Sequence, residues 1–248
     1  TELESVLRKR GKSDELELLE SDLPSAGQTS FTRQQEPLGL GHAVWCARNM
    51  IGDEPFALLL PDMVMQSEPG CLKQMMDVYA ETGGGNIIAV ETVPWAEVSR
   101  YGVVDFSKTD GLALAINGMI EKPERDKAPS NHIISGRYIL QPEIFAKIES
   151  AKPGAGGEIQ LTDAMVALME EQPFWGCKFE GVTFDCGDKL GFLMANVAHG
   201  LLRDDIGPAF RLGLEKLLQR SLTVDPLPVG NVNERAGLPV TRKQPAAA

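Results

Sequence analysis

The chain has 248 residues, 43% of them hydrophobic, and a formal net charge of −11. That length suits one large domain or two small ones with a sizeable core, and the acidic balance argues against a general nucleic-acid-binding protein. No apolar run approaches the roughly 20 residues that span a bilayer, and the charged opening TELESVLRKRGK is unlike a secretory signal. We therefore expect a cytoplasmic protein, whose substrate can still be a small anion held in a local basic pocket.

The predicted elements alternate along the chain. Leucines at helical spacing predict helix within residues 1–24, up to the break at SDLPSAG. Apolar runs at 56–60 and 86–93 predict buried strands, and 71–81 between them predicts a helix. The stretch 101–140 predicts shorter strands with less helix between them, and further helices are predicted at 142–150, 158–171, 188–203 and 207–220.

This alternation predicts an α/β fold whose central sheet is mixed, mostly parallel and flanked by helices. We expect a single domain over residues 1–222. Residues 223–248 are rich in Pro, Gly and Ala and show no periodicity. They are expected to form a tail with little structure of its own.

A glycine-rich loop at 34–44, QQEPLGLGHAV, leads into helix-like sequence. Glycine lets the backbone approach a ligand closely, and the Gln34 amide carries a donor and an acceptor that suit the imide edge of a base such as uracil. A plain turn before a helix explains the same residues, because a lone GxG pattern is common. The loop alone leaves both interpretations open.

Two aspartates follow strand-like runs. Asp62 comes after the run at 56–60, and Asp185 closes a shorter run within FDCGDKLGF. Ligands bind open α/β sheets at the carboxyl ends of strands, and a carboxylate buried there needs a compensating charge such as Mg²⁺. A helix N-cap or a turn aspartate is the alternative for Asp62.

A glutamate and a lysine, Glu121 and Lys122, end another strand-like run in NGMIEKPERD. In a cleft the lysine suits a phosphate and the glutamate a sugar hydroxyl, although an exposed pair at a strand end is commonplace. The run PGAGGEIQLTDA at 153–164 is a glycine-rich loop that enters a helix. It suits a phosphate cradle, or equally a helix whose first turn holds Glu158 against the helix dipole.

Several chemistries lack their sequence signals. The chain contains no GxSxG nucleophile elbow, no GxxxxGK[ST] phosphate loop and no GxGxxG dinucleotide fingerprint. Its three histidines stand in unrelated contexts. Its four cysteines show no CxxC spacing, so we expect reduced thiols rather than a disulfide framework.

Eight blocks in this order, RQQEPLGLGHAV, LLLPD, SRYGVV, EKP, APSN, GRYIL, PGAGGEIQLTDA and FDCGDKLGF, resemble the bacterial UTP–glucose-1-phosphate uridylyltransferases, the UDP-glucose pyrophosphorylases. The likeness covers residues 1–220 and implies a Rossmann-like nucleotidyltransferase fold. It implies an enzyme of carbohydrate metabolism that transfers uridylyl from UTP to glucose 1-phosphate, giving UDP-glucose and pyrophosphate. It also implies Mg²⁺ as cofactor and a homo-oligomer, either a dimer or a tetramer.

The resemblance implies a role for each candidate residue. Gln34 and Gly39 would hold the uracil, with Gly41 and His42 starting the helix behind it. Asp62 would be a catalytic residue that binds Mg²⁺, with Asp185 as the second carboxylate. The remaining candidates would contact the sugar (Gly102, Glu121 and Gly136) or the phosphates (Lys122 as a catalytic residue and Lys189 as a weaker candidate).

One departure from the family is large. Members begin with a strand and a signature of the form GxGTRxxPxTKxxPKE, which residues 1–248 do not contain. We expect an incomplete chain rather than a truncated relative without catalysis, because the other substrate residues persist. Two alternatives stay open: a non-catalytic regulatory paralogue that binds sugar nucleotide, and a thymidylyltransferase that acts on the same sugar phosphate.

Overall fold

A computed structural model describes residues 2–25, 27–108 and 113–221. The contacts divide the chain into two compact units, one ending at Asp185 and the other beginning at Cys186. Each unit is described by itself. The tail predicted at 223–248 lies outside the described residues, and the single domain predicted over 1–222 stays a prediction.

The helical pattern predicted within residues 1–24 is confirmed as two helices, α1 (Glu2–Lys9) and α2 (Ser13–Asp22). Gly11 separates them with a φ of +64°, which glycine adopts without steric cost. Arg8 and Glu20 form an ion pair that joins the two helices. Neither helix has a buried residue.

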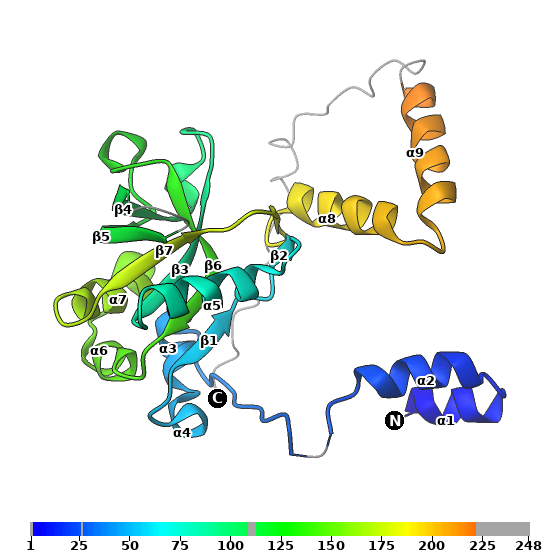
Figure 1. Ribbon diagram of the computed structural model, residues 1–248, viewed down its shortest axis with the longest axis horizontal. Helices are drawn as coiled ribbons and strands as arrows, with labels where there is room; N and C mark the ends of the chain where they lie inside the picture. The colour runs from blue at the N-terminus through cyan, green and yellow to red at the C-terminus, as the bar shows by residue number, and fades with distance from the viewer. Residues whose placement is uncertain (1, 26, 109–112, 222–248) are drawn as a thin grey trace, which may run out of the picture. The chain divides into compact units, whose positions relative to one another are not determined.

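A six-stranded sheet forms the centre of the first unit, in the order β1-β6-β3-β7-β5-β4 (Figure 1). Its strands are β1 (Phe56–Leu59), β3 (Asn86–Thr92), β4 (Gly102–Lys108), β5 (Ala113–Glu121), β6 (His132–Leu140) and β7 (Phe174–Lys178). A separate two-stranded sheet pairs β2 (Met63–Gln66) with β8 (Val182–Asp185).

The α/β class and the mixed central sheet are confirmed, but the expectation of mostly parallel strands is wrong for the described strands. Within this sheet, β3 and β7 run parallel. The other described pairings, β1–β6, β3–β6, β4–β5, β4–β6 and β5–β7, are antiparallel. The reason lies in the connections: only residues 109–112 separate β4 from β5, too few for the crossover that parallel strands need.

Side-chain alternation along β3 builds an apolar layer on each face of the sheet. Ile88 and Val90 join one buried cluster, while Ile87 and Ala89 join another. Three helices supply the first cluster, α3 (Leu40–Trp45), α6 (Ile144–Ser150) and α7 (Leu161–Met169). The helix α5 (Cys71–Glu81) supplies the second. The run at 86–93 is therefore apolar on both faces because both are covered, which confirms the predicted buried strand.

The first predicted strand, 56–60, is confirmed as β1, but the expectation that it is buried is wrong. Its side chains alternate between half-buried and exposed, and Leu59 is 47% exposed. The reason is its position: β1 is the edge strand of the described sheet and pairs with β6 on one side. Neighbouring strands and helices therefore cover β1 less completely than they cover β3.

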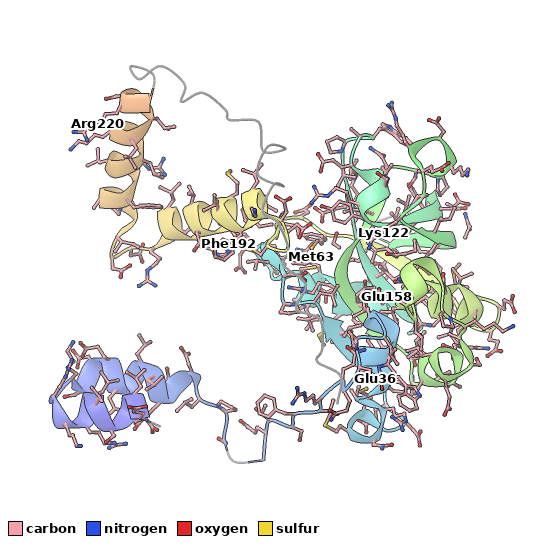
Figure 2. The ribbon with its side chains drawn as sticks, turned by 180° about the vertical axis from the view of Figure 1, so that it is seen from behind. Glu36, Met63, Lys122, Glu158, Phe192 and Arg220 are labelled. Carbon is pink, nitrogen blue, oxygen red and sulfur yellow. The ribbon has the colours of Figure 1, made fainter. Side chains whose placement is uncertain are left out.

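The second unit contains α8 (Lys189–Leu202) and α9 (Gly207–Ser221), which confirm the helices predicted at 188–203 and 207–220. A Cβ atom at Gly200 would lie 2.8 Å from the Phe210 ring, so the two helices pack closely there. Large apolar side chains of both helices are exposed, including the labelled Phe192 in Figure 2. In residues 2–25, 27–108 and 113–221, no helix combines the length and apolar character needed to cross a membrane.

Candidate active site

A cavity of about 250 Å³ lies in the first unit, where the β2–β8 pair, the paired ends of β4 and β5, and the start of α7 come together. Six of the residues singled out in the sequence line it: Asp62, Gly102, Glu121, Lys122, Gly136 and Asp185. The fold thus gathers acids, a lysine and glycines from distant parts of the chain into one cavity.

Strand pairing brings the two aspartates together. The strands β2 and β8 are antiparallel with Met63 opposite Asp185, so Asp62 lies at the same end of the pair. Asp62 is in the turn between β1 and β2, which excludes the helix N-cap alternative. No group of three or more His, Cys, Asp or Glu in the described part of the chain could hold a metal ion. Two carboxylates fit a hydrated Mg²⁺, which takes one or two from the protein and fills its other positions with water and phosphate oxygens.

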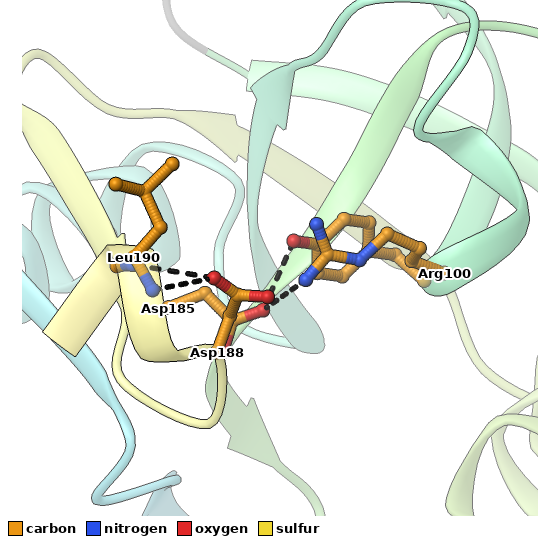
Figure 3. A network of polar contacts seen from close by, with 6 residues as sticks. Arg100, Asp185, Asp188 and Leu190 are labelled. Atoms are coloured by element: carbon orange, nitrogen blue, oxygen red, sulfur yellow. Dashed lines mark hydrogen bonds and ion pairs between the residues drawn. The ribbon is translucent and has the colours of Figure 1, made fainter. Parts of the chain in front are cut away.

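The Asp185 carboxylate is held by two residues that the sequence analysis did not single out (Figure 3). Tyr101 Oη donates a hydrogen bond to Asp185 Oδ2 over 3.0 Å, and Arg100 Nη2 lies 3.5 Å from the same oxygen. Burial, followed by the hydrogen bond to Asp185, raises the pKa of the Tyr101 hydroxyl to about 12. This hydroxyl therefore remains a donor at neutral pH.

Tyr101 also fixes the backbone of the lysine. Its carbonyl accepts a hydrogen bond from Lys122 N over 3.1 Å. Lys122 has a φ of +44°, the only positive value among the described residues other than glycine. Such a conformation costs about 1–3 kcal/mol and persists where the surroundings hold it, often at functional sites. The strain distinguishes Lys122 from an ordinary surface lysine at a strand end.

The Glu121 carboxylate lies on the same wall. Its side chain is 17% exposed, and Lys122 Nζ is 3.9 Å from its Oε1. Thr162 Oγ1 donates a hydrogen bond to Glu121 Oε2 over 2.7 Å. A Cβ atom at Gly102 would lie only 3.1 Å from that same oxygen. The absence of a side chain at Gly102 therefore leaves space for the Glu121 carboxylate.

The backbone at Gly136 also lies very close to a neighbouring side chain. Its φ is +68°, and a Cβ atom there would lie 2.8 Å from Met63 Cγ. Arg137, the next residue, donates hydrogen bonds to the backbone carbonyls of Leu60 and Met63. The segment that carries Asp62 is thereby fixed against β6.

The loop predicted to bind the base lies beside this cavity. Gln34 Nε2 donates to Gly39 O over 3.0 Å and lies 3.0 Å from His42 Nδ1. Gly39 precedes α3 with a φ of +101°, and Leu40, the first residue of that helix, lines the cavity. Both Gln34 contacts use the amide nitrogen, which orders the side chain next to the glycine predicted to share its ligand.

The glycine-rich run 153–164 supports this loop. Ile159 N donates to Leu38 O over 2.7 Å, and Gly41 N donates to Ile159 O over 2.9 Å. The expectation that Glu158 stands in the first turn of the helix is wrong. The helix α7 begins at Leu161, so Asp163 is the acid in that turn. The residues before the helix pair with the loop and form no part of the helix.

Lys189 belongs to the second unit, where it is the first residue of α8. Its role in phosphate binding stays a prediction.

The sequence analysis missed three lining residues that contact the candidate carboxylates: Arg100, Tyr101 and Thr162. Each stands inside a block that carries the family resemblance, SRYGVV or PGAGGEIQLTDA. Their partners lie far away in sequence, so a contiguous motif contains no signal for the contacts. The only hint in the sequence is that Arg100 and Tyr101 directly precede the predicted Gly102, and that Thr162 lies in the glycine-rich run 153–164.

Comparison with known proteins agrees with this geometry. The Nucleotidyl transferase family profile matches residues 6–199. The UTP--glucose-1-phosphate uridylyltransferase of Bacillus subtilis (strain 168) is 45% identical over 211 residues, which is 84% of this chain and 72% of that protein. The Staphylococcus epidermidis (strain RP62A) protein of the same name is 41% identical over 87% of this chain and 74% of its own length.

Solved structures give the same result. The structure described as UTP-bound UGPase from Acinetobacter baumannii matches with a TM-score of 0.77 and 36% identity, over 87% of this chain and 75% of that one. A UDP-glucose pyrophosphorylase complexed with UDP-glucose matches with a TM-score of 0.68 and 39% identity, over 70% of this chain and 66% of that one. The chain therefore belongs to the nucleotidyl transferase family and, within it, to the UTP–glucose-1-phosphate uridylyltransferases.

Proposed function

We propose that this protein transfers the uridylyl group of UTP to glucose 1-phosphate, releasing UDP-glucose and pyrophosphate. The observation that carries the proposal is the single cavity on whose wall Asp62, Asp185, Glu121 and Lys122 meet. The names of the relatives, and the UTP and UDP-glucose named in the descriptions of two similar structures, support the same reaction.

In the proposed reaction, a phosphate oxygen of glucose 1-phosphate attacks the α-phosphorus of UTP. A new P–O bond forms between the sugar phosphate and the α-phosphorus, and the bond from the α-phosphorus to the oxygen that bridges to the β-phosphorus breaks. That oxygen leaves with pyrophosphate. The nucleophile is already ionised at neutral pH, so the site needs no strong base. It must instead align two anions and neutralise their charge.

Nucleotidyltransferases of this kind generally use a divalent metal ion, and we propose Mg²⁺ here. The donor set fits, because the cavity offers two aspartates and none of the thiolate or imidazole ligands that softer metals prefer. Asp62 and Asp185 would hold the ion. When bound, it would neutralise charge on the α-phosphate and on the leaving pyrophosphate.

In this proposal, Lys122 and Glu121 bind different parts of glucose 1-phosphate. The Lys122 ammonium binds phosphate oxygens, and the Glu121 carboxylate accepts hydrogen bonds from glucose hydroxyls. Gly102 and Gly136 line the same cavity and would contact the sugar through their backbone; a Cβ atom at either position would press on neighbouring side chains of the site. Lys189 is a further candidate for a phosphate contact.

The uracil binds at Gln34 and Gly39 in this proposal. Both Gln34 contacts use Nε2, so Oε1 is directed to accept the imide N–H of the base. Gly39 offers backbone to the same edge. We also propose a cytoplasmic homo-oligomer, a dimer or a tetramer, that binds neither nucleic acid nor membrane. The exposed apolar side chains of α8 and α9 support the oligomer, and the net charge of −11 supports the absence of nucleic acid.

Product analysis of the full-length protein tests the proposal. Incubation with glucose 1-phosphate, Mg²⁺ and either UTP or dTTP is followed by chromatography of the nucleotides and an assay of pyrophosphate. We expect UDP-glucose and pyrophosphate in equal amounts, with UTP strongly preferred. Preference for dTTP would show a thymidylyltransferase. Binding of UDP-glucose without turnover would show a non-catalytic paralogue.

A further inference from the structure

A threonine on α7 makes an unusual contact with the sugar side of the cavity. Thr162 stands in the first turn of the helix, is 7% exposed and lines the cavity. Its hydroxyl reaches across to the end of β5 and donates to Glu121 Oε2 over 2.7 Å. The donor proton of a buried hydroxyl is thus committed to one oxygen of one carboxylate.

Two further residues lie beside the same Glu121 carboxylate. Gly102 lies against Glu121 Oε2, since a Cβ atom there would come within 3.1 Å of that oxygen and 3.5 Å of Thr162 Oγ1. On the other side, Lys122 Nζ lies 3.9 Å from Oε1. The terminal torsion of a glutamate is broad and almost free without such contacts. Here Oε2 is anchored, and Oε1 is directed toward the lysine that the proposed function assigns to the sugar phosphate.

We propose that Thr162 is the positioning residue that makes this site selective among hexose 1-phosphates, by aiming the Glu121 carboxylate at one hydroxyl of glucose. The inference rests on the proposed function. A site built to bond one hydroxyl rejects an epimer in which that hydroxyl points elsewhere, because a buried polar group is left unpaired. That rejection requires an acceptor that cannot turn to follow the misplaced hydroxyl. Thr162 supplies this constraint without touching the nucleotide.

The test compares Thr162→Val, Thr162→Ser and the parent in the full-length protein. Valine has the size of threonine but lacks the hydroxyl, whereas serine keeps the hydroxyl and lacks the methyl group. For Thr162→Val we expect the KM for glucose 1-phosphate to rise about tenfold, the scale of one hydrogen bond to a charged group. The kcat and the KM for UTP should stay within about twofold, because uridylyl binding and phosphate alignment do not use this hydroxyl.

The selectivity gives a second measurement. The ratio of kcat/KM for glucose 1-phosphate to kcat/KM for galactose 1-phosphate or mannose 1-phosphate should fall in Thr162→Val and recover in Thr162→Ser. Thr92→Val is the matched control. This variant makes the same substitution at the exposed last residue of β3, where the Thr92 hydroxyl lies 3.4 Å from His132 Nε2 and outside the cavity lining. Thr92→Val should change neither the KM for glucose 1-phosphate nor the selectivity ratio. Thermal melts of all variants are measured alongside the kinetics.

Calorimetric titration with UDP-glucose and UDP-galactose measures the same preference without turnover. A parent that prefers UDP-glucose but turns nothing over would refute the proposed function, while a preference lost in Thr162→Val and restored in Thr162→Ser would still support the inference. A Thr162→Val protein with the parental KM and preference would overturn the inference. Equal losses in kcat and in both KM values, shared by Thr162→Ser, would overturn it too, since they would show a structural role.

Discussion

Asp62 and Lys122 illustrate how the surroundings of a single side chain can indicate a function. Both stand at the end of a strand, a position where an exposed charged residue is ordinary. The cavity lining, the neighbouring Asp185 and the positive φ at Lys122 separate them from that ordinary case. Each of the following variants therefore removes one charged or polar group from the site.

Asp62→Asn should lower kcat by about a hundredfold or more at ordinary Mg²⁺ concentrations, because it removes one of two proposed carboxylate ligands. Titration with Mn²⁺, followed by electron paramagnetic resonance, should show weaker binding in the same variant. Asp105→Asn, an exposed aspartate on β4, is the control for a loss of negative charge. Parental activity and parental Mn²⁺ binding in Asp62→Asn would remove Asp62 from the metal site.

Lys122→Ala should lower turnover by about a hundredfold or more while leaving the melting temperature unchanged, because the proposed role of the ammonium is to neutralise phosphate oxygens and it carries little of the packing. Lys122→Arg should recover little, since a planar fork meets phosphate with different geometry from a compact ammonium. Lys127→Ala, a lysine of the nearby exposed Glu124–Lys127 ion pair, serves as control. If steady-state kinetics found the parental rate in Lys122→Ala, this lysine would be a surface charge only.

The positive φ at Lys122 can be tested separately by comparing a glycine variant with the alanine variant. A glycine tolerates positive φ, so Lys122→Gly should melt no lower than Lys122→Ala although both lack the ammonium. A lower melting temperature in the glycine variant would show that the conformation at Lys122 is not strained.

Gln34→Ala should weaken UTP binding by about 1–3 kcal/mol, the range for a buried polar group left without its partner. It should also reduce the preference for UTP over CTP, because the proposed role of this amide is to bind the imide edge of uracil. Isothermal titration calorimetry with both nucleotides measures the two effects. Gln28→Ala, an exposed glutamine whose side chain accepts from Ser25 N, is the control. Unchanged UTP affinity in Gln34→Ala would place the base elsewhere.

Single candidates of this kind could be predicted where a residue type and a strand end coincide, as at Asp62, Asp185 and Glu121. Thr162 and Tyr101 could not. The Thr162 hydroxyl meets Glu121 across α7 and β5, and the Tyr101 hydroxyl meets Asp185 across β4 and β8. Such pairs depend on tertiary packing, for which the local sequence carries no periodic or compositional signal.

At the scale of the element, β3 contains a half-buried acid that the proposed reaction does not use. Glu91 Oε1 accepts a hydrogen bond from Ser135 Oγ over 2.7 Å. Burial raises the pKa of the Glu91 carboxyl above its ordinary value of 4.5; the bond from Ser135 works against this shift, and the charge of Asp185 adds to it. Above pH 4.5 the unfolded chain releases this proton while the fold still holds it, so the carboxyl lowers stability as pH rises.

Glu91→Gln should therefore melt at a higher temperature than the parent near pH 7. Glutamine carries no ionisation cost and keeps an oxygen that accepts from Ser135. The gain should shrink as pH falls through 4.5 and approach zero at about pH 3.5, where the parental carboxyl is largely protonated in both states. Thermal melts across this pH range measure it, with Glu81→Gln at the exposed end of α5 as control. A gain that does not change with pH would contradict the ionisation argument.

The elements themselves could be predicted where period and length agree, as for β3, α5, α8 and α9. Strand direction could not, because it depends on which strands pair. The antiparallel pairing of β1 with β6, for example, joins segments far apart in sequence. Exposure of β1 likewise depends on its place at the edge of the described sheet, and an apolar run does not encode that place.

At the scale of the whole molecule, an acidic protein must bind two anionic substrates. The net charge is −11, yet at physiological salt charges farther away than about 8 Å are largely screened. Binding therefore depends on the local arrangement. Lys122 and Arg100 bring positive charge to the cavity, and a metal ion on Asp62 and Asp185 would add more. The fold assembles this local field by joining the β2–β8 pair to the ends of β4 and β5.

We propose that one cavity holds both the sugar phosphate and the metal-bound phosphates. A crystal structure of the full-length protein with UDP-glucose and Mg²⁺ would decide this. We expect Mg²⁺ on the Asp62 and Asp185 carboxylates, Lys122 Nζ on a phosphate oxygen, and a glucose hydroxyl on Glu121, with the uracil against Gln34 and Gly39. A product bound elsewhere, or one bound here with Lys122 and both aspartates turned to solvent, would refute the shared site.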